Sequence, residues 1–123
     1  PLRRATQTAA VVASELGYED KVILDAALRP EAGYEKFQEL LRRYSRKDAI
    51  IVVGHNPSMT LFLNQLLSGG RPLNAIELKK GGVAKVEKDG RKPAVLKWCM
   101  PPKVVRAIQQ ASASSSRPKT VPK

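Results

Sequence analysis

The stretch that decides the fold joins an apolar run to residues typical of a turn and a helix start: Ala49-Ile50-Ile51-Val52-Val53-Gly54-His55-Asn56-Pro57. Five consecutive apolar residues without polar alternation are typical of a strand that is covered on both faces, as in a parallel sheet. Asn56 is a good N-cap and Pro57 suits the first position of a helix. The stretch therefore predicts a buried strand, a tight turn and a helix from Ser58 to Leu67 in direct succession.

His55 occupies the turn where that strand should end. In parallel sheets ligands bind beyond the carboxyl ends of the strands. The start of the following helix is expected to direct free N–H groups and a partial positive charge to the same place. A histidine there can donate a hydrogen bond to a phosphoryl group or move a proton. On position alone a single histidine near a sheet is more often structural or merely exposed, so both interpretations stay open at this point.

The residues before this stretch predict two helices and a short strand. Apolar residues recur at helical spacing over 5–16, and Gly17 is then a helix stop. A second helix is expected over 34–44, with an apolar face opposite a charged one. Between them, 22–24 is rich in β-branched residues and predicts a strand, which a loop follows.

The residues after the stretch predict a hairpin and a polar tail. Asp89-Gly90 is a strong hairpin signal that joins 83–88 to 94–99, and a short helix is expected after Pro101. Residues 111–123 are mostly Ser, Ala, Pro and Lys and predict a disordered basic tail. Helix, buried strand, helix and hairpin in this order predict a layered α/β domain.

Length and composition limit the class of protein. The chain has 123 residues, enough for one small domain. Its single cysteine, Cys99, excludes an internal disulfide and fits a reducing compartment, so a cytoplasmic protein is expected. One cysteine and one histidine do not supply a Cys/His zinc cluster. The formal net charge of +11 favours anionic partners: phosphate esters, phosphoproteins or nucleic acid.

Two arginines near the start of the chain are a second candidate for phosphate binding. Arg3 and Arg4 precede the first predicted helix by one turn or less, and an arginine there can present its planar donor fork to a phosphate. Taken alone, two basic residues at a chain end are more simply interpreted as solvated. The chain opens at Pro1 rather than at methionine, which we interpret as a fragment whose upstream part is not included.

Together these segments resemble the histidine phosphatase superfamily, and within it the small SixA-like phosphohistidine phosphatases. The opening run from Pro1 to Ala9 is similar to a family segment whose arginine binds the phosphoryl group and matches Arg4. The run 52–57 is similar to the segment of the family's second histidine, which matches His55. Two further runs are similar to the SixA-like branch: 77–82 and 96–103. The resemblance covers most of residues 1–105.

The resemblance implies a fold and a reaction. The fold is phosphoglycerate mutase-like, a three-layer α/β/α sandwich with a mostly parallel sheet, here without its first βα unit. Residues 1–110 then form the C-terminal part of the histidine phosphatase domain. In the implied reaction a phosphoryl group passes to a histidine and then to water. The family's nucleophile is the histidine of an Arg-His-Gly segment, which is absent from this sequence, so these residues alone are not expected to turn over substrate.

The same resemblance assigns roles to individual residues. His55 and Arg4 are the implied catalytic residues: His55 stabilises charge on the transferring phosphoryl group and Arg4 clamps it. Both also belong to the implied substrate-binding set, together with Asn56. No cofactor and no metal ion are expected. Mutase-like branches carry an acidic proton donor in a loop that here contains Arg29 and Glu31, and Glu31 is more simply an ordinary loop residue.

Two other functions stay open from the sequence. The first is a non-catalytic phosphate- or protein-binding domain of the same fold, which requires that no upstream Arg-His-Gly segment exists. The second is a basic nucleic-acid-binding module, suggested by the basic run 42–47 and the tail, but the chain has only six aromatic residues and no recognition motif. The expected partner is a phosphorylated protein or a small phosphoester, and neither a membrane nor nucleic acid is expected. The sequence does not indicate the oligomeric state.

Overall fold

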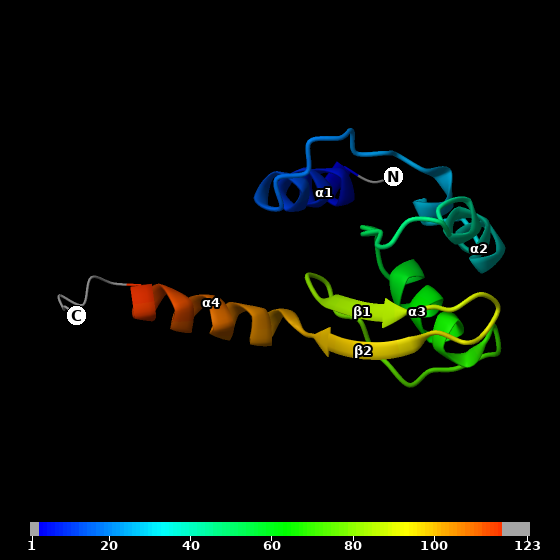
Figure 1. Cartoon of the computed structure of the whole chain (residues 1–123). Helices are drawn as coiled ribbons and strands as arrows, with labels where there is room; N and C mark the ends of the chain where they lie inside the picture. Colours follow the sequence, from blue (N-terminus) through cyan, green and yellow to red (C-terminus); the bar gives the residue numbers. More distant parts are fainter. Residues whose placement is uncertain (1–2, 117–123) are drawn as a thin grey trace.

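The computed structural model describes residues 3–116, which form an α/β fold of four α-helices and a two-stranded antiparallel sheet. The elements follow one another along the chain as α1 (Arg3–Glu15), the 3-10 helix η1 (Ala26–Leu28), α2 (Tyr34–Arg43), α3 (Ser58–Ser68), β1 (Val83–Glu87), β2 (Val95–Met100) and α4 (Pro102–Ser116) (Figure 1). No helix in this part of the chain is long and apolar enough to cross a membrane.

The first three α-helices begin and end within two residues of their predicted bounds. Beyond α1, Gly17 adopts a φ of +67°, a left-handed conformation that glycine reaches without steric cost. At the end of α3, Gly69 has a φ of +72° and its N–H donates to the carbonyl of Gln65. Gly17 therefore ends α1 as the sequence predicts, and Gly69 ends α3 in the same left-handed conformation.

The core lies between α2 and α3. The rings of Phe37 and Phe62 are stacked, with centroids 4.7 Å apart, and each residue is only 3% exposed. Four further buried apolar residues surround this pair: Ala27, Leu40, Leu66 and Ala94. The hairpin joins the same core, because Ala94 N donates to Leu66 O at 2.8 Å. Each large side chain buried here contributes about 1.5–3 kcal/mol of transfer free energy.

The predicted hairpin is confirmed. β1 and β2 pair antiparallel, with Val83 opposite Met100 and Glu87 opposite Val95. The register shifts between Lys85 and Val86, where a β-bulge increases the local twist. Because the two strands are joined only to each other, this sheet contains no parallel pair in the described residues.

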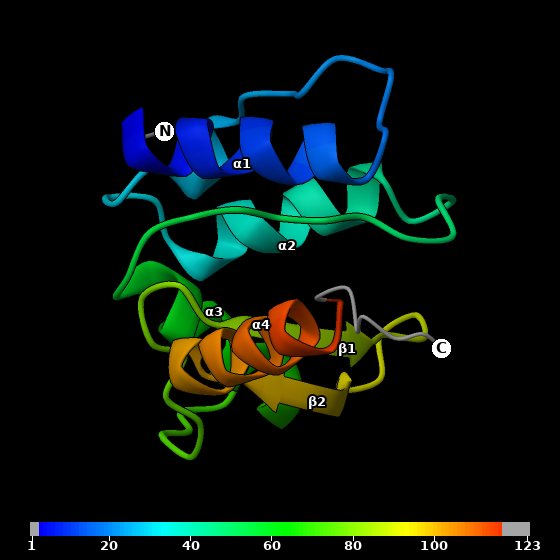
Figure 2. The same cartoon turned by 90° about the vertical axis from the view of Figure 1, so that its left-hand side faces the viewer.

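The predicted strands 22–24 and 49–53 are not strands in the structure. Both runs lack a strand partner in the described part of the chain, and Figure 2 draws 49–53 as a plain tube that leads from α2 to α3. Leu24 is 62% exposed and Ile51 is 64% exposed. A strand requires a neighbour for its backbone hydrogen bonds, and residues 3–116 place none beside these runs. The mostly parallel sheet is therefore absent from the described residues.

The last helix is longer than predicted. The sequence predicts disorder from residue 111, whereas α4 continues to Ser116. Ala111 and Ala113 have the highest intrinsic helix propensity, and a helix that has already formed its first turns extends at little cost. Residues 1–2 and 117–123, which include the first part of the Arg4 motif and the rest of the predicted tail, lie outside the described residues.

Candidate functional site

His55 lies in the loop that leads into α3, and its side chain is exposed. The preceding residue lets this loop come close to the helix. A Cβ atom at Gly54 would lie 2.8 Å from Cγ of Met59 and closer still to its Sδ, so no larger residue fits without a shift of the Met59 side chain. The carbonyl of His55 accepts a hydrogen bond from Met59 N at 3.2 Å. The glycine thus permits, and this bond stabilises, the position of His55 at the start of α3.

Asn56 is not the N-cap of α3, contrary to the prediction. Pro57 occupies that position, with helical dihedral angles. The Asn56 side chain still serves the first turn, because its Oδ1 accepts a hydrogen bond from Thr60 N at 3.2 Å. Its Nδ2 donates to the carbonyl of Leu78. Asn56 therefore joins the His55 loop to a segment that follows α3 in the chain.

The start of α3 offers fewer free N–H groups than the sequence predicts. Met59 N is bonded to His55 O and Thr60 N to the Asn56 side chain, while Pro57 has no N–H. In the described residues only the N–H of Ser58 among these first positions has no acceptor. An anion at this place would therefore be held mainly by side chains, and less by the backbone of the helix.

Asn56, Thr60 and Asn64 form a row of hydrogen-bonded polar side chains that the sequence analysis did not predict. Asn64 is 1% exposed and makes four hydrogen bonds: its Nδ2 donates to Thr60 O and Ile76 O, and its Oδ1 accepts from Ala75 N and Ile76 N. Thr60 Oγ1 accepts from Leu78 N at 3.2 Å and lies 3.0 Å from Leu78 O. Thr60 and Asn64 are four residues apart on one face of α3, and Asn56 continues the same spacing just before the helix begins. The spacing of these three polar residues is the feature of the sequence that could have indicated this row.

The loop that carries Arg29 and Glu31 also reaches the start of α3. Ser58 Oγ donates to Pro30 O at 3.3 Å, and both Arg29 and Glu31 are exposed. Upstream, Asp25 fixes the turn that leads into this loop. Its Oδ1 accepts from Ala27 N at 2.8 Å, and its Oδ2 accepts from Arg43 at 2.9 Å. The structure thus brings the loop 29–31 to the start of α3, although no hydrogen bond joins Glu31 to His55 in the described part.

Arg4 lies on the first turn of α1 and is exposed. In Figure 2 the start of α1 and the loop that leads into α3 lie at the same edge of the molecule, on the left. No hydrogen bond or ion pair joins Arg4 to His55 within residues 3–116. Of the three predicted site residues, the chain itself places His55 and Asn56 together, whereas Arg4 comes from a separate element.

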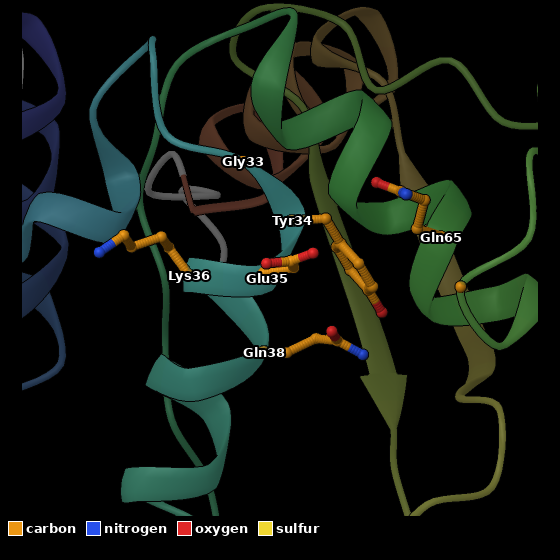
Figure 3. A pocket seen from close by; sticks show the side chains of 7 residues that line it. Gly33, Tyr34, Glu35, Lys36, Gln38 and Gln65 are labelled. Carbon is orange, nitrogen blue, oxygen red and sulfur yellow. The ribbon is translucent and has the colours of Figure 1, made fainter.

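Two cavities of the described residues, both away from the start of α3, are not lined by any of the predicted site residues. The first, of about 500 Å³, lies between α2 and α3 and is lined by Gly33, Tyr34, Glu35, Lys36, Gln38, Gln65 and Gly70 (Figure 3). Burial raises the pKa of the Tyr34 hydroxyl above its ordinary value, and a hydrogen bond with Gln38 opposes this shift. The second is lined by Leu61, Gln65, Pro72, Leu73 and Asn74. His55 belongs to an open surface and to neither cavity.

The two segments that reach the start of α3 through the carbonyls of Leu78 and Pro30 carry charged residues of both signs, Glu77 and Glu31 among them. Lys79 and Lys80 follow Leu78 directly and are exposed, as is Arg29. Lys79 Nζ lies 4.0 Å from a carboxylate oxygen of Glu77, and both side chains are more than half exposed, so this ion pair is weak. The exposed imidazole of His55 can donate a hydrogen bond to a phosphoryl group, and exposed cations on the neighbouring segments add positive charge to this side of the molecule.

No protein family, curated protein or solved structure matches this chain.

Proposed function

We propose that this chain is the C-terminal part of a histidine phosphatase-type phosphohydrolase of the SixA-like branch. Its substrate would be a phosphohistidine of a protein or a small phosphoester in the cytoplasm. The observation that carries the proposal is the exposed His55, in a Gly-His-Asn-Pro turn held against the start of α3 by the hydrogen bond from Met59 N to His55 O. The resemblance of this turn and of the Arg4 segment to the phosphatase motifs adds the reaction class.

The proposal includes a finer fold, a three-layer α/β/α sandwich with a mostly parallel sheet. The runs 22–24 and 49–53 support it, because both are apolar and neither has a strand partner in the described residues. Ile50 is 41% exposed and Ile51 is 64% exposed. A strand supplied from outside residues 1–123 would pair with the backbone of 49–53 and cover these side chains.

In this mechanism the chain supplies the positive charge and another segment supplies the nucleophile. His55 is the only histidine of the chain, so the nucleophilic histidine has to come from elsewhere. A ring nitrogen of that nucleophilic histidine forms a bond to phosphorus while the bond from phosphorus to the leaving nitrogen or oxygen breaks. Water then cleaves the new phosphorus–nitrogen bond and releases phosphate. His55 and the guanidinium of Arg4 stabilise the charge on the equatorial oxygens during both steps.

The first experiment reads the residues that the coding DNA specifies upstream of Pro1. An apolar strand that ends in Arg-His-Gly supports the proposal, and a start codon close to Pro1 without such a segment favours a non-catalytic domain. The extended chain is then assayed on a phosphohistidine peptide. Replacing His55 or Arg4 by alanine should lower the rate by about 100-fold or more. An unchanged rate in either variant would overturn the assignment.

A non-catalytic phosphate-binding domain is the second candidate. It is favoured by the lack of a second histidine in residues 1–123. It predicts that inorganic phosphate shifts the imidazole resonances of His55 in the present chain, and that the extended chain hydrolyses none of the substrates. A nucleic-acid-binding module has less support, because Tyr34, Phe37 and Phe62 pack against one another at the core and do not form a stacking platform.

A further inference from the structure

The turn that precedes β1 lies beside the loop that carries His55. Asn56 and Thr60 both contact the carbonyl of Leu78, which directly precedes this turn. The two segments are therefore held together by the side chains of Asn56, just before α3, and Thr60, on its first turn, although 22 residues separate Asn56 from Leu78.

The turn has a defined conformation. Gly82 N donates to Lys79 O at 2.7 Å, and Gly81 adopts a φ of +82°, which favours glycine. A Cβ atom at Gly82 would lie 2.9 Å from the carbonyl oxygen of Lys79 and 3.3 Å from that of Met100, so backbone on two sides closes around this position. Lys79 and Lys80 thus project from a tight turn and not from a flexible loop.

Both lysines are available to a partner. They are exposed, and the only carboxylate within 4.0 Å of either ammonium in the described residues is that of Glu77, at 4.0 Å from Lys79 Nζ. Neither lysine lines one of the two cavities. A lysine ammonium is a flexible point charge, which suits carboxylates on a second surface better than one fixed oxygen of a small molecule.

We propose that Lys79 and Lys80 form a docking rim for acidic side chains that flank the phosphoryl group of a protein substrate. This inference rests on the proposed function, favours the protein among its two substrates, and adds a specificity determinant outside the phosphoryl-binding residues, namely acidic side chains beside the phosphorylated one. The open surface around His55 favours a protein, because a protein can reach an exposed imidazole and the adjacent turn at the same time. Charge complementarity of this kind mainly raises the association rate and sets specificity.

Nucleic acid fits this rim less well. Binding of single strands depends on aromatic side chains that stack on bases, and the turn 78–82 contains no aromatic residue. Trp98, which is 41% exposed, lies on β2 opposite Lys85 and not in the turn. Acidic protein side chains require only the two ammonium groups that the turn presents.

The test measures the affinity of the 123-residue chain for three synthetic peptides. The first carries a stable phosphonate analogue of phosphohistidine flanked by glutamates, the second has glutamines in place of the glutamates, and the third has the glutamates without the phosphonate. The variant K79Q/K80Q removes the rim. The matched control K88Q/K92Q removes the same charge from the other end of the hairpin, between β1 and β2. Circular dichroism and urea unfolding verify that both variants fold.

We expect K79Q/K80Q to weaken binding of the acidic phosphonate peptide by about tenfold at low salt, and that of the glutamine peptide by less than about twofold. The control should change neither affinity by more than about twofold. Equal losses for both peptides, or equal losses in both variants, would overturn the docking rim. A single-stranded oligonucleotide serves as a fourth probe. If it binds more tightly than the acidic phosphonate peptide, and K79Q/K80Q abolishes that binding, the docking rim for acidic side chains is overturned in favour of a nucleic-acid site.

The variant H55A separates this inference from the proposed function. Loss of the preference for the phosphonate peptide over the peptide without phosphonate supports His55 as the phosphoryl-binding residue. If H55A leaves that preference unchanged while K79Q/K80Q still weakens the acidic peptides, the proposed function fails and the rim stands. If H55A removes the preference and K79Q/K80Q has no effect, the proposed function stands and the rim fails.

Discussion

The side chain of Asn56 donates a hydrogen bond from Nδ2 to the carbonyl of Leu78, 22 residues further along the chain. Its Oδ1 at the same time accepts from the backbone N–H of Thr60. The residue beside the only histidine thus holds together the His55 loop, the first turn of α3 and the segment before the lysine turn. In the proposed site Asn56 acts on a phosphoryl group mainly by positioning its neighbours, since its Nδ2, the group that could donate to a phosphoryl oxygen, already donates to the carbonyl of Leu78.

The buried carboxamide of Asn64 should be the polar group whose loss costs most stability. The variant N64A leaves Ala75 N and Ile76 N without their acceptor and Ile76 O without a donor. Because each buried group left unsatisfied costs about 1–3 kcal/mol, we expect the free energy of unfolding to fall by about 3 kcal/mol or more. Urea unfolding measures this difference. N74A removes the same side chain from an exposed position and should change stability by less than about 0.5 kcal/mol. Equal effects of the two variants would show that the hydrogen bonds of Asn64 do not stabilise the fold.

Gly54 and Met59 should be energetically coupled. An alanine at 54 would place its Cβ 2.8 Å from Met59 Cγ, and such overpacking costs about 1–3 kcal/mol. Removing the Met59 side chain makes room for that Cβ, so the double variant G54A/M59A should lose less stability than the sum of G54A and M59A. Denaturant unfolding of all four proteins completes the cycle. A strictly additive result would show that the glycine is not required by this contact.

Asp25 should stabilise the loop that carries Arg29 and Glu31. Its carboxylate caps η1 through Ala27 N and pairs with Arg43, and its side chain is only 13% exposed. We expect D25A to lower the free energy of unfolding by about 1–2 kcal/mol. D20A, at an exposed acid of the same type, is the matched control and should have an effect of less than about 0.5 kcal/mol. If D25A and D20A lower the free energy of unfolding by the same amount, the cap and the ion pair of Asp25 contribute nothing measurable to stability.

The sequence predicts the local elements well and the sheet poorly, for a physical reason. The spacing of Phe37 and Leu40, the glycines at 17 and 69, and Asp89-Gly90 specify structure through neighbours in the chain, and the corresponding helices and hairpin are found where they are expected. A strand in a parallel sheet depends on partners distant in the chain. The runs 22–24 and 49–53 therefore have the composition of buried strands but no partner in residues 3–116.

In the candidate site, too, features set by neighbours in the chain could be predicted, and contacts between distant segments could not. The position of His55 just before α3 could be predicted from its immediate neighbours. The contacts of Asn56 and Thr60 with Leu78, and of Ser58 with Pro30, could not, because they join separate segments through main-chain carbonyls, which every residue carries. The polar spacing 56, 60, 64 was visible, but it does not identify the segment that these side chains bind.

Ile51 distinguishes the described fold from the proposed parallel sheet. In the 123-residue chain this side chain is 64% exposed, so I51E should change the free energy of unfolding by less than about 0.5 kcal/mol. If upstream residues supply a strand that pairs with 49–53, the same substitution buries a carboxylate in the extended chain and should destabilise it by about 3 kcal/mol or more. Exposed Leu61 provides the control L61E, which should behave alike in both chains. Equal effects of I51E in the two chains would exclude 49–53 as an inner strand, because an inner strand cannot accept an unpaired charge without loss of stability.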